Sequence, residues 1–241
     1  MTKTELIYLE DSYLKEAEVT VLEANAARNS VTLDGTIFYP EGGGQPSDKG
    51  RIDSALGSST VIHVAKQGNQ VYHYLEGPLP SKEEEVTLKL DWDRRYAHMR
   101  NHTAQHLLSR IIFDKYRART AGNQVHADAS HIDFAPATFQ SDELPVIEAE
   151  ANRLIQEDHL VTIAFIDRAE LEKEMGPDRA DLSRLPTSIK RLRMVRIGNF
   201  DAYPCAGTHV RSTGELKQLT ITKRKSKGKE RIRITYQLAS L

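Results

Sequence analysis

The chain has a single cysteine, Cys205, among its 241 residues. One cysteine cannot form an internal disulfide, so nothing in the sequence argues for secretion. No stretch approaches the roughly 18 uninterrupted apolar residues that a membrane helix needs. The first residues carry acidic side chains instead of the apolar run of a signal peptide. These absences predict a cytoplasmic protein without a membrane partner.

The chain also lacks a large net charge, because 33 basic and 34 acidic residues nearly cancel. The balance is uneven near the C-terminus, where basic residues crowd a segment that has few acids. Such a tract indicates a binding surface for the phosphates of a nucleic acid. It is equally typical of a solvated hairpin tip whose lysines prevent edge pairing. The residues expected to contact RNA are Lys223, Arg224, Lys225, Lys227 and Lys229.

The first 90 residues or so show short alternating apolar runs that are separated by Gly, Asn, Asp and Pro. Regularly spaced short strands with turn signals between them are typical of a small β-barrel. We therefore expect a barrel domain over residues 1–90. Its expected strands are 17–22, 30–38, 59–64, 70–75 and 85–90.

A glycine run, Gly42, Gly43 and Gly44, interrupts these strands. Consecutive glycines can adopt positive φ and let backbone N–H groups approach a ligand closely. They can equally form a plain flexible loop. The strand and helix that flank a nucleotide-phosphate cradle are missing around them, so this use is disfavoured.

From residue 91 the apolar period changes to that of helices, which predicts a second domain over 91–241. One helix is expected over 94–116 and another over 142–160, capped by Ser141 or Asp142. The first has an apolar stripe, and its members are Ala104, Leu107, Leu108, Ile111 and Ile112.

The rest of this second domain reads as strands and loops. Helices laid on a mainly antiparallel sheet would make it an α+β domain of two layers. The expected segments are extended chain around a hairpin in 122–134, strands at 161–167 and 191–197, a polar loop at 176–181, and a hairpin of 216–223 with 231–238.

Two pairs of candidate metal ligands share the same internal spacing: His102 with His106, and Cys205 with His209. Residues four apart on a helix lie on one face, so both imidazoles of the first pair can hold one ion. His98 with His102 has this spacing too, but His98 lies farther round the helix. Imidazole and thiolate in groups of four are typical of tetrahedral zinc.

Each of these residues alone would have a plainer explanation. A lone cysteine is often a small buried hydrophobe, and a lone helical histidine is more often exposed or hydrogen-bonded. Two matched pairs together favour one zinc ion per chain, held by His102, His106, Cys205 and His209.

The sequence limits what such a zinc ion could do. Proteases with an H-E-x-x-H motif need a glutamate after the first histidine, but Thr103 follows His102 and Gln105 cannot accept a proton. The nucleophile is best drawn as a water molecule held by the metal, the substrate or the backbone, with no side-chain base assigned. Zinc lowers the pKa of bound water to about 7.

The number of ligands leaves the role of the zinc open. Four protein ligands is the number typical of a closed, structural site, whereas a catalytic zinc keeps one position open. Either one ligand exchanges, the ion expands to five-coordinate, or the zinc chiefly orients the substrate.

Three segments in order resemble a known family. Residues 101–108 and 201–215 resemble the editing domain of alanyl-tRNA synthetase, and 38–48 resembles the glycine motif of the small barrel that precedes that domain. The combination covers almost the whole chain and is similar to the free-standing alanyl-tRNA editing proteins in their medium-length form.

The resemblance implies a hydrolase that acts in trans on mischarged tRNA for alanine. It would cleave the ester of a wrong amino acid, chiefly serine and sometimes glycine. The two ligand pairs would bind the zinc ion, and 119–125 would match the strand that lines the amino-acid pocket. Thr120 is the best candidate there for a contact to the serine hydroxyl. The other expected substrate contacts are Gly122, Gln105, Gly42, Gly43 and Gly44.

Two other functions fit the same residues. One is a non-catalytic RNA-binding module in which the zinc is purely structural. The other is a hydrolase of small esters that uses the basic tract only for solubility.

Overall fold

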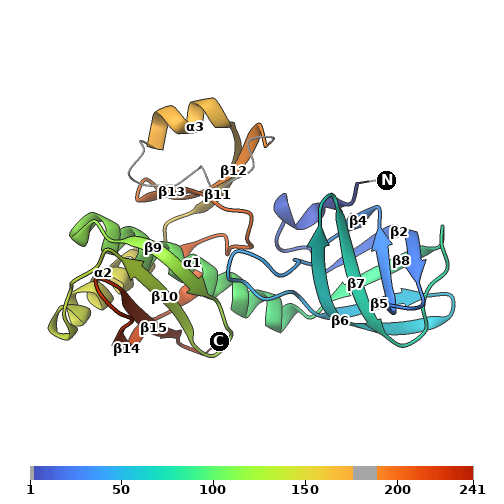
Figure 1. Ribbon diagram of the computed structural model, residues 1–241, viewed down its shortest axis with the longest axis horizontal. Helices are drawn as coiled ribbons and strands as arrows, with labels where there is room; N and C mark the ends of the chain where they lie inside the picture. Colours follow the sequence, from blue (N-terminus) through green and yellow to red (C-terminus); the bar gives the residue numbers. More distant parts are fainter. Residues whose placement is uncertain (1–2, 176–188, 241) are drawn as a thin grey trace. The chain divides into compact units, whose positions relative to one another are not determined.

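The computed structural model describes residues 3–175 and 189–240, so the polar loop expected at 176–181 lies outside the described residues. The chain forms two compact units, Met1–Met99 and Arg100–Leu241 (Figure 1). The long helix α1 (Trp92–Tyr116) contributes residues to both units. None of the helices in the described ranges is long and apolar enough to cross a membrane.

The first unit is built on a closed antiparallel barrel with the strand order β2-β3-β7-β6-β5-β8. Alternation along the strands directs residues such as Val61, Val71 and Leu75 into a single apolar core. Closure leaves the barrel without an open edge. The strands are β2 (Glu16–Asn25), β3 (Ser30–Leu33), β5 (Gly50–Ser54), β6 (Gly57–Gln67), β7 (Gln70–Glu76) and β8 (Glu85–Leu90).

The expected barrel is confirmed, but two of its strands differ from expectation. The strand expected over 30–38 ends at Leu33, although the Asp34 N–H still donates to the Thr20 carbonyl of β2 at 3.0 Å. The next two residues form β4 (Gly35–Thr36), which pairs in parallel with β1 (Glu5–Leu6). Strand β5 was not expected, since Ile52 is the only apolar residue it contributes.

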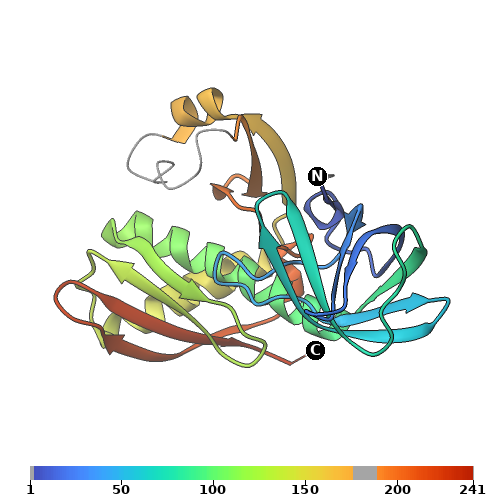
Figure 2. The same ribbon diagram turned by 45° about the vertical axis from the view of Figure 1, so that its right-hand side comes forward.

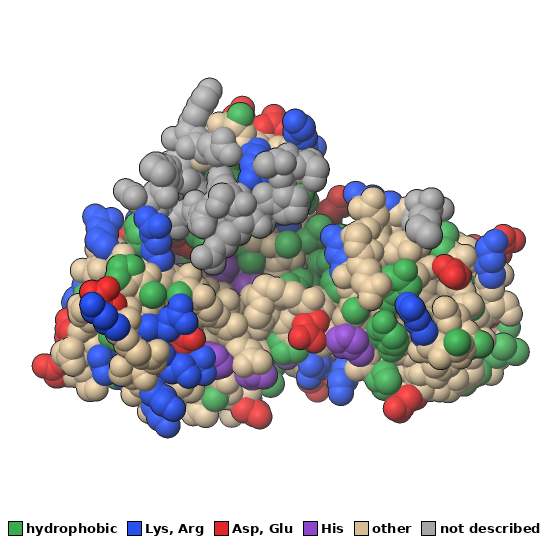
Figure 3. All heavy atoms as spheres, viewed as in Figure 1, with side chains coloured by type: hydrophobic (Ala, Val, Ile, Leu, Met, Phe, Trp, Pro, Cys, Tyr) green, Lys and Arg blue, Asp and Glu red, His purple; other side chains and the backbone are tan. Residues whose placement is uncertain are grey.

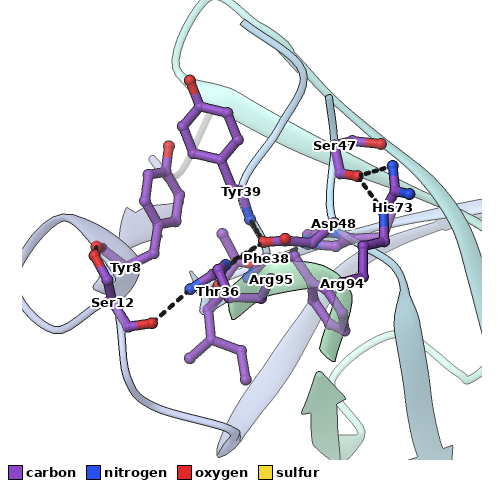
Figure 4. Close-up of polar contacts among 11 residues, drawn as sticks. Tyr8, Ser12, Thr36, Phe38, Tyr39, Ser47, Asp48, His73, Arg94 and Arg95 are labelled. Carbon is purple, nitrogen blue, oxygen red and sulfur yellow. Dashed lines mark hydrogen bonds and ion pairs between the residues drawn. The ribbon is translucent and has the colours of Figure 1, made fainter. Parts of the chain in front are cut away.

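A buried ion pair joins the end of the glycine-rich segment to α1 (Figure 4). The side chains of Arg95 and Asp48 are both fully buried, and two guanidinium nitrogens donate to one carboxylate oxygen. Arg95 also donates to the carbonyls of Ser12 and Ile37. Asp48 in turn accepts from the Tyr39 N–H at 2.6 Å. The Arg95 guanidinium and Oδ2 of Asp48 are therefore directed at protein partners.

The second unit contains a four-stranded antiparallel sheet in the order β14-β15-β10-β9. Its strands are β9 (Arg119–Gln124), β10 (Ser130–Ala135), β14 (Leu219–Ser226) and β15 (Ile232–Leu238). Helices α1 and α2 (Leu144–Gln156) lie along one face of this sheet (Figure 2). The α+β class is therefore confirmed.

A separate three-stranded antiparallel sheet completes the second unit, in the order β11 (Val161–Asp167), β12 (Arg191–Ile197) and β13 (Asp201–Pro204). Helix α3 (Arg168–Met175) follows β11 directly. The strands at 161–167 and 191–197 were expected, whereas β13 and α3 were not.

Helix α2 is shorter than the expected 142–160. It ends at Gln156, and Asp158 then takes a positive φ of 51°, which a continuing helix cannot accommodate. The cap expected at Ser141 or Asp142 is wrong. Gln140 and Glu143 instead form a reciprocal capping box around a 3-10 turn, and this box satisfies the backbone donors at that end.

The middle of α1 is buried on every side, since each residue from 98 to 108 is buried. The expected apolar stripe forms one face of this stretch, and all five of its residues are buried. His102 and His106 occupy another face and are only 3% and 5% exposed. Buried imidazoles need polar partners, which lie in the segment after β12.

Candidate metal centre

The second unit brings the two ligand pairs together. His102 and His106 project from successive turns of α1, while Cys205 follows the end of β13 and His209 lies four residues further on. In the part of the chain that the structure describes, these four residues form the cluster with metal-binding potential, and His98 does not belong to it. The preferred helix pair, His102 with His106, is therefore the pair whose side chains lie close to Cys205.

The donor atoms of the cluster converge closely, with one atom from each residue within 4.8 Å of the others. The Cys205 Sγ lies 3.5 Å from Nε2 of His102 and 3.3 Å from Nε2 of His209. A tetrahedral ion with ligand distances of about 2.0–2.3 Å separates its donors by about 3.3–3.8 Å. The two sulfur–nitrogen distances therefore fit a single metal ion, and the other donors lie close enough to belong to the same cluster.

The loop that carries Cys205 is fixed by backbone contacts to β12. The Cys205 N–H donates to the Arg193 carbonyl at 3.0 Å. The Arg193 guanidinium donates in return to the carbonyls of Cys205 and Gly207, at 2.7 and 2.9 Å. The Gly207 N–H also donates to Sγ at 3.3 Å, which favours a thiolate at this position.

Electrostatics favour the protonation states that a metal needs. Burial raises the pKa of the Cys205 thiol, but the nearby imidazoles of His102 and His209 outweigh it, and the pKa lies well below the ordinary value. Burial lowers the pKa of His209 well below its usual value, and His102 acts in the same direction. A thiolate beside a neutral imidazole is the form in which both groups bind a metal.

Two further side chains orient the histidines. The Thr103 Oγ1 lies 3.1 Å from Nδ1 of His209 and accepts the N–H of Val210 at 3.3 Å. The buried carboxylate of Asp201 lies 3.7 Å from Nδ1 of His106. The Thr103 contact engages Nδ1 of His209, and Nε2 of the same ring lies 3.3 Å from Sγ of Cys205.

Sequence reasoning missed Thr103 and Asp201 as parts of this site. Thr103 stands inside the H-x-x-x-H motif and Asp201 four residues before Cys205, so both were within the motifs used. No spacing rule in the sequence identifies a residue that contacts a ligand histidine from elsewhere in the fold. Each role depends on a contact across the fold, between α1 and the segment around β13.

Two of the expected substrate contacts, Gln105 and Thr120, are linked through a serine of α1. Gln105 Nε2 donates to Ser109 Oγ at 3.1 Å, and Ser109 Oγ lies 2.8 Å from Thr120 Oγ1. Gly122 is not part of this group. It pairs with Asp133 across the β9–β10 ladder, whereas Thr120 pairs with Phe134 after a register shift, so the two residues face opposite sides of the sheet.

The glycine run lies in the first unit and forms a tight, well-fixed turn. Gly42 and Gln45 exchange two backbone hydrogen bonds, and Gly43 and Gly44 between them have φ of 58° and 82°. The Tyr39 hydroxyl donates to the Gly42 carbonyl at 2.9 Å. Positive φ at both central positions explains the glycines. A substrate contact by Gly42, Gly43 or Gly44 stays a prediction.

The basic tract lies on the β14–β15 hairpin, as expected, and Lys and Arg side chains gather over this part of the second unit (Figure 3). Lys223, Lys225, Lys227 and Lys229 are exposed. Arg224 is half-buried and donates from Nε to the Phe139 carbonyl at 2.9 Å. This hydrogen bond within the protein therefore explains part of the position of Arg224.

Comparison with known families matches both units of the chain. Residues 4–94 match the model described as "tRNA synthetases class II (A)". Residues 192–235 match the model described as "Threonyl and Alanyl tRNA synthetase second additional domain". The second match contains Cys205 and His209.

Individual relatives cover nearly the whole chain. An alanyl-tRNA editing protein AlaX-M from Methanosarcina barkeri is 36% identical over 98% of this chain and 99% of its own length. An alanyl-tRNA editing protein AlaX-L from Pyrococcus horikoshii is 34% identical over 96% of the chain, which spans 57% of that protein. The alanine–tRNA ligase of Pyrococcus abyssi is 37% identical over 96% of the chain, which spans 26% of the ligase. With a full-length match at this identity, the chain belongs to the family of alanyl-tRNA editing proteins of the AlaX-M form.

Proposed function

We propose that this protein is a zinc-dependent deacylase that hydrolyses the ester between a wrong amino acid and the tRNA for alanine, in the cytoplasm. Serine is the proposed principal amino acid and glycine a second one. The observation that carries the proposal is the convergence of three imidazoles and one thiolate within 4.8 Å, in a chain whose full-length relatives are named for alanyl-tRNA editing.

Zinc is the proposed metal because of the donor set. Three nitrogen ligands and one thiolate suit zinc better than Mg²⁺ or Ca²⁺, which prefer oxygen. When bound, zinc supplies positive charge and Lewis acidity next to the ester. Asp201 and Thr103 support this assignment, since carboxylate and hydroxyl partners fix the orientation of ligating histidines.

The remaining parts of the site would bind and orient the substrate. Thr120 and Gln105, linked through Ser109, are the proposed contacts to the amino-acid side chain. The exposed lysines of the hairpin would hold the acceptor stem through its phosphates, which orients the tRNA without reading its sequence. We assign no side-chain base, and the proposed nucleophile is a water molecule held in the site.

A deacylation assay with seryl- and alanyl-tRNA for alanine tests this function. The intact protein should release serine rapidly and spare alanine, because a polar group of the pocket is left unpaired when the hydroxyl is missing. Cys205→Ala should lose this activity. The matched control is His126→Ala, which removes an exposed histidine of the same unit and should behave as the intact protein does.

The same assay separates the other two functions. If the protein binds tRNA but releases no serine, it is an RNA-binding module with a structural metal. If it hydrolyses a small ester such as p-nitrophenyl acetate but leaves seryl-tRNA intact, it is a general esterase.

A further inference from the structure

Three polar side chains form a hydrogen-bonded chain that starts next to a metal ligand. Gln105 immediately precedes His106 on α1, and its Nε2 donates to Ser109 Oγ at 3.1 Å. Ser109 lies three residues beyond His106, a spacing that keeps both on one side of the helix. Ser109 Oγ then lies 2.8 Å from Thr120 Oγ1 on β9.

A β-bulge directs Thr120 toward this chain. Gly122 pairs with Asp133 and Thr120 pairs with Phe134, so Ala121 is left without a cross-strand partner. The extra residue reverses the alternation, and Thr120 therefore shares the face of the buried Phe134, toward α1. Without the bulge, residues two apart would face the same side, and Thr120 would follow Gly122 away from α1.

The Ser109–Thr120 contact allows either hydroxyl to be the donor. A hydroxyl has one proton and two acceptor lone pairs. Because the Gln105 amide already donates to Ser109, the Ser109 proton is available for Thr120 Oγ1. When Ser109 donates, Thr120 accepts, and the Thr120 proton is left for another acceptor. Both hydroxyl residues are half-buried, so a ligand can reach them.

We propose that Ser109 is a positioning residue for substrate selection, which turns the Thr120 hydroxyl so that it donates to the side-chain oxygen of a seryl group. The inference rests on the proposed deacylase function and adds to it a residue that no motif identified. Ser109 acts through Thr120, so it should affect substrates with a hydroxyl more than those without one.

The test compares kcat/KM for seryl- and glycyl-tRNA for alanine in the zinc-loaded protein. Ser109→Ala should lower the serine-to-glycine ratio about fivefold, the scale of removing one hydrogen bond. Ser109→Thr keeps the hydroxyl and should restore most of the ratio. Ser54→Ala is the matched control, because it removes a half-buried, hydrogen-bonded serine of the first unit.

A double variant distinguishes positioning from a general structural effect. If Ser109 acts only through Thr120, Ser109→Ala combined with Thr120→Val should give the ratio of Thr120→Val alone. Losses that multiply would contradict the proposal, as would a Ser109→Ala ratio equal to that of the intact protein. Those results leave the deacylase function standing. If the intact protein releases no serine from seryl-tRNA, both the deacylase function and the role of Ser109 are overturned. Thermal denaturation and zinc content verify that each variant is folded and loaded.

Discussion

The two units of the molecule each bury a prominent group of polar side chains, and these two groups differ in where their polar atoms point. In the first unit, Arg95 donates to Asp48 and to the carbonyls of Ser12 and Ile37. In the second unit, nitrogen and sulfur atoms of His102, His106, Cys205 and His209 converge on one point. In the first group the guanidinium is paired with a carboxylate and with backbone carbonyls, whereas the second group has the arrangement of a ligand set. Burial alone thus does not identify a candidate site, whereas the convergence of imidazole and thiol donors indicates one.

The largest expected effect comes from removing a member of the ligand set. Cys205→Ala should lower the zinc content that survives purification, because the variant keeps three imidazoles but loses the thiolate that completes the four-ligand set. Inductively coupled plasma mass spectrometry should find about one zinc per chain in the intact protein and in His126→Ala. Equal zinc content in Cys205→Ala would contradict the assignment.

Breaking the other group should change stability and leave the metal in place. Asp48→Ala leaves the Arg95 charge buried without its carboxylate, which should cost about 3–5 kcal/mol of unfolding free energy. The matched control is Asp53→Ala, which breaks the partly exposed pair with Lys89 and should cost about 1 kcal/mol or less. Urea denaturation measures both. A similar cost for the two variants would show that the buried pair has no special role.

A smaller effect is expected from the residues that orient the histidines. Asp201→Asn and Thr103→Val should each weaken zinc binding about 10- to 100-fold, since partners of ligating histidines typically contribute this much. Competition with a chromogenic chelator gives the affinities. Thr222→Val, at an exposed threonine of β14, is the control and should bind zinc as the intact protein does. Unchanged affinity in both test variants would mean that the four ligands are sufficient by themselves.

The smallest effect concerns the hairpin. Replacing Lys225, Lys227 and Lys229 together by Ala should weaken tRNA binding and flatten its salt dependence, by about 0.7–0.9 in log–log slope for each phosphate that the variant no longer neutralises. The control replaces Lys3, Lys66 and Lys82, three exposed lysines of the first unit. Filter binding over a range of salt concentrations measures the slopes. The same slope in both triple variants would mean that the hairpin is merely solvated.

Periodicity in the sequence predicted the elements whose apolar pattern is long. Examples are the helix ending at Tyr116, the barrel and the β14–β15 hairpin, although the first hairpin strand covers 219–226 and not the expected 216–223. The spacing of the two ligand pairs identified the cluster. The features that periodicity could not predict depend on which strands pair with each other and in which register. The bulge at Ala121 follows from the register against β10, and the four residues of β13 carry no pattern of their own.

The glycine-rich segment shows a different limit. The sequence allowed either a ligand-binding loop or a plain loop at Gly42, Gly43 and Gly44. The structure explains the glycines at 43 and 44 by their positive φ. It explains Asp48 by the buried pair with Arg95. Backbone conformation and packing within the first unit are thus sufficient to explain these residues.

The most direct test of the metal centre is X-ray absorption at the zinc edge of the purified protein. We expect one sulfur neighbour at about 2.3 Å and three nitrogen neighbours at about 2.0–2.1 Å. Cys205→Ala, reconstituted with zinc, should lose the sulfur shell. A spectrum of the intact protein with only nitrogen and oxygen neighbours, or with more than one sulfur, would contradict a centre built from His102, His106, Cys205 and His209.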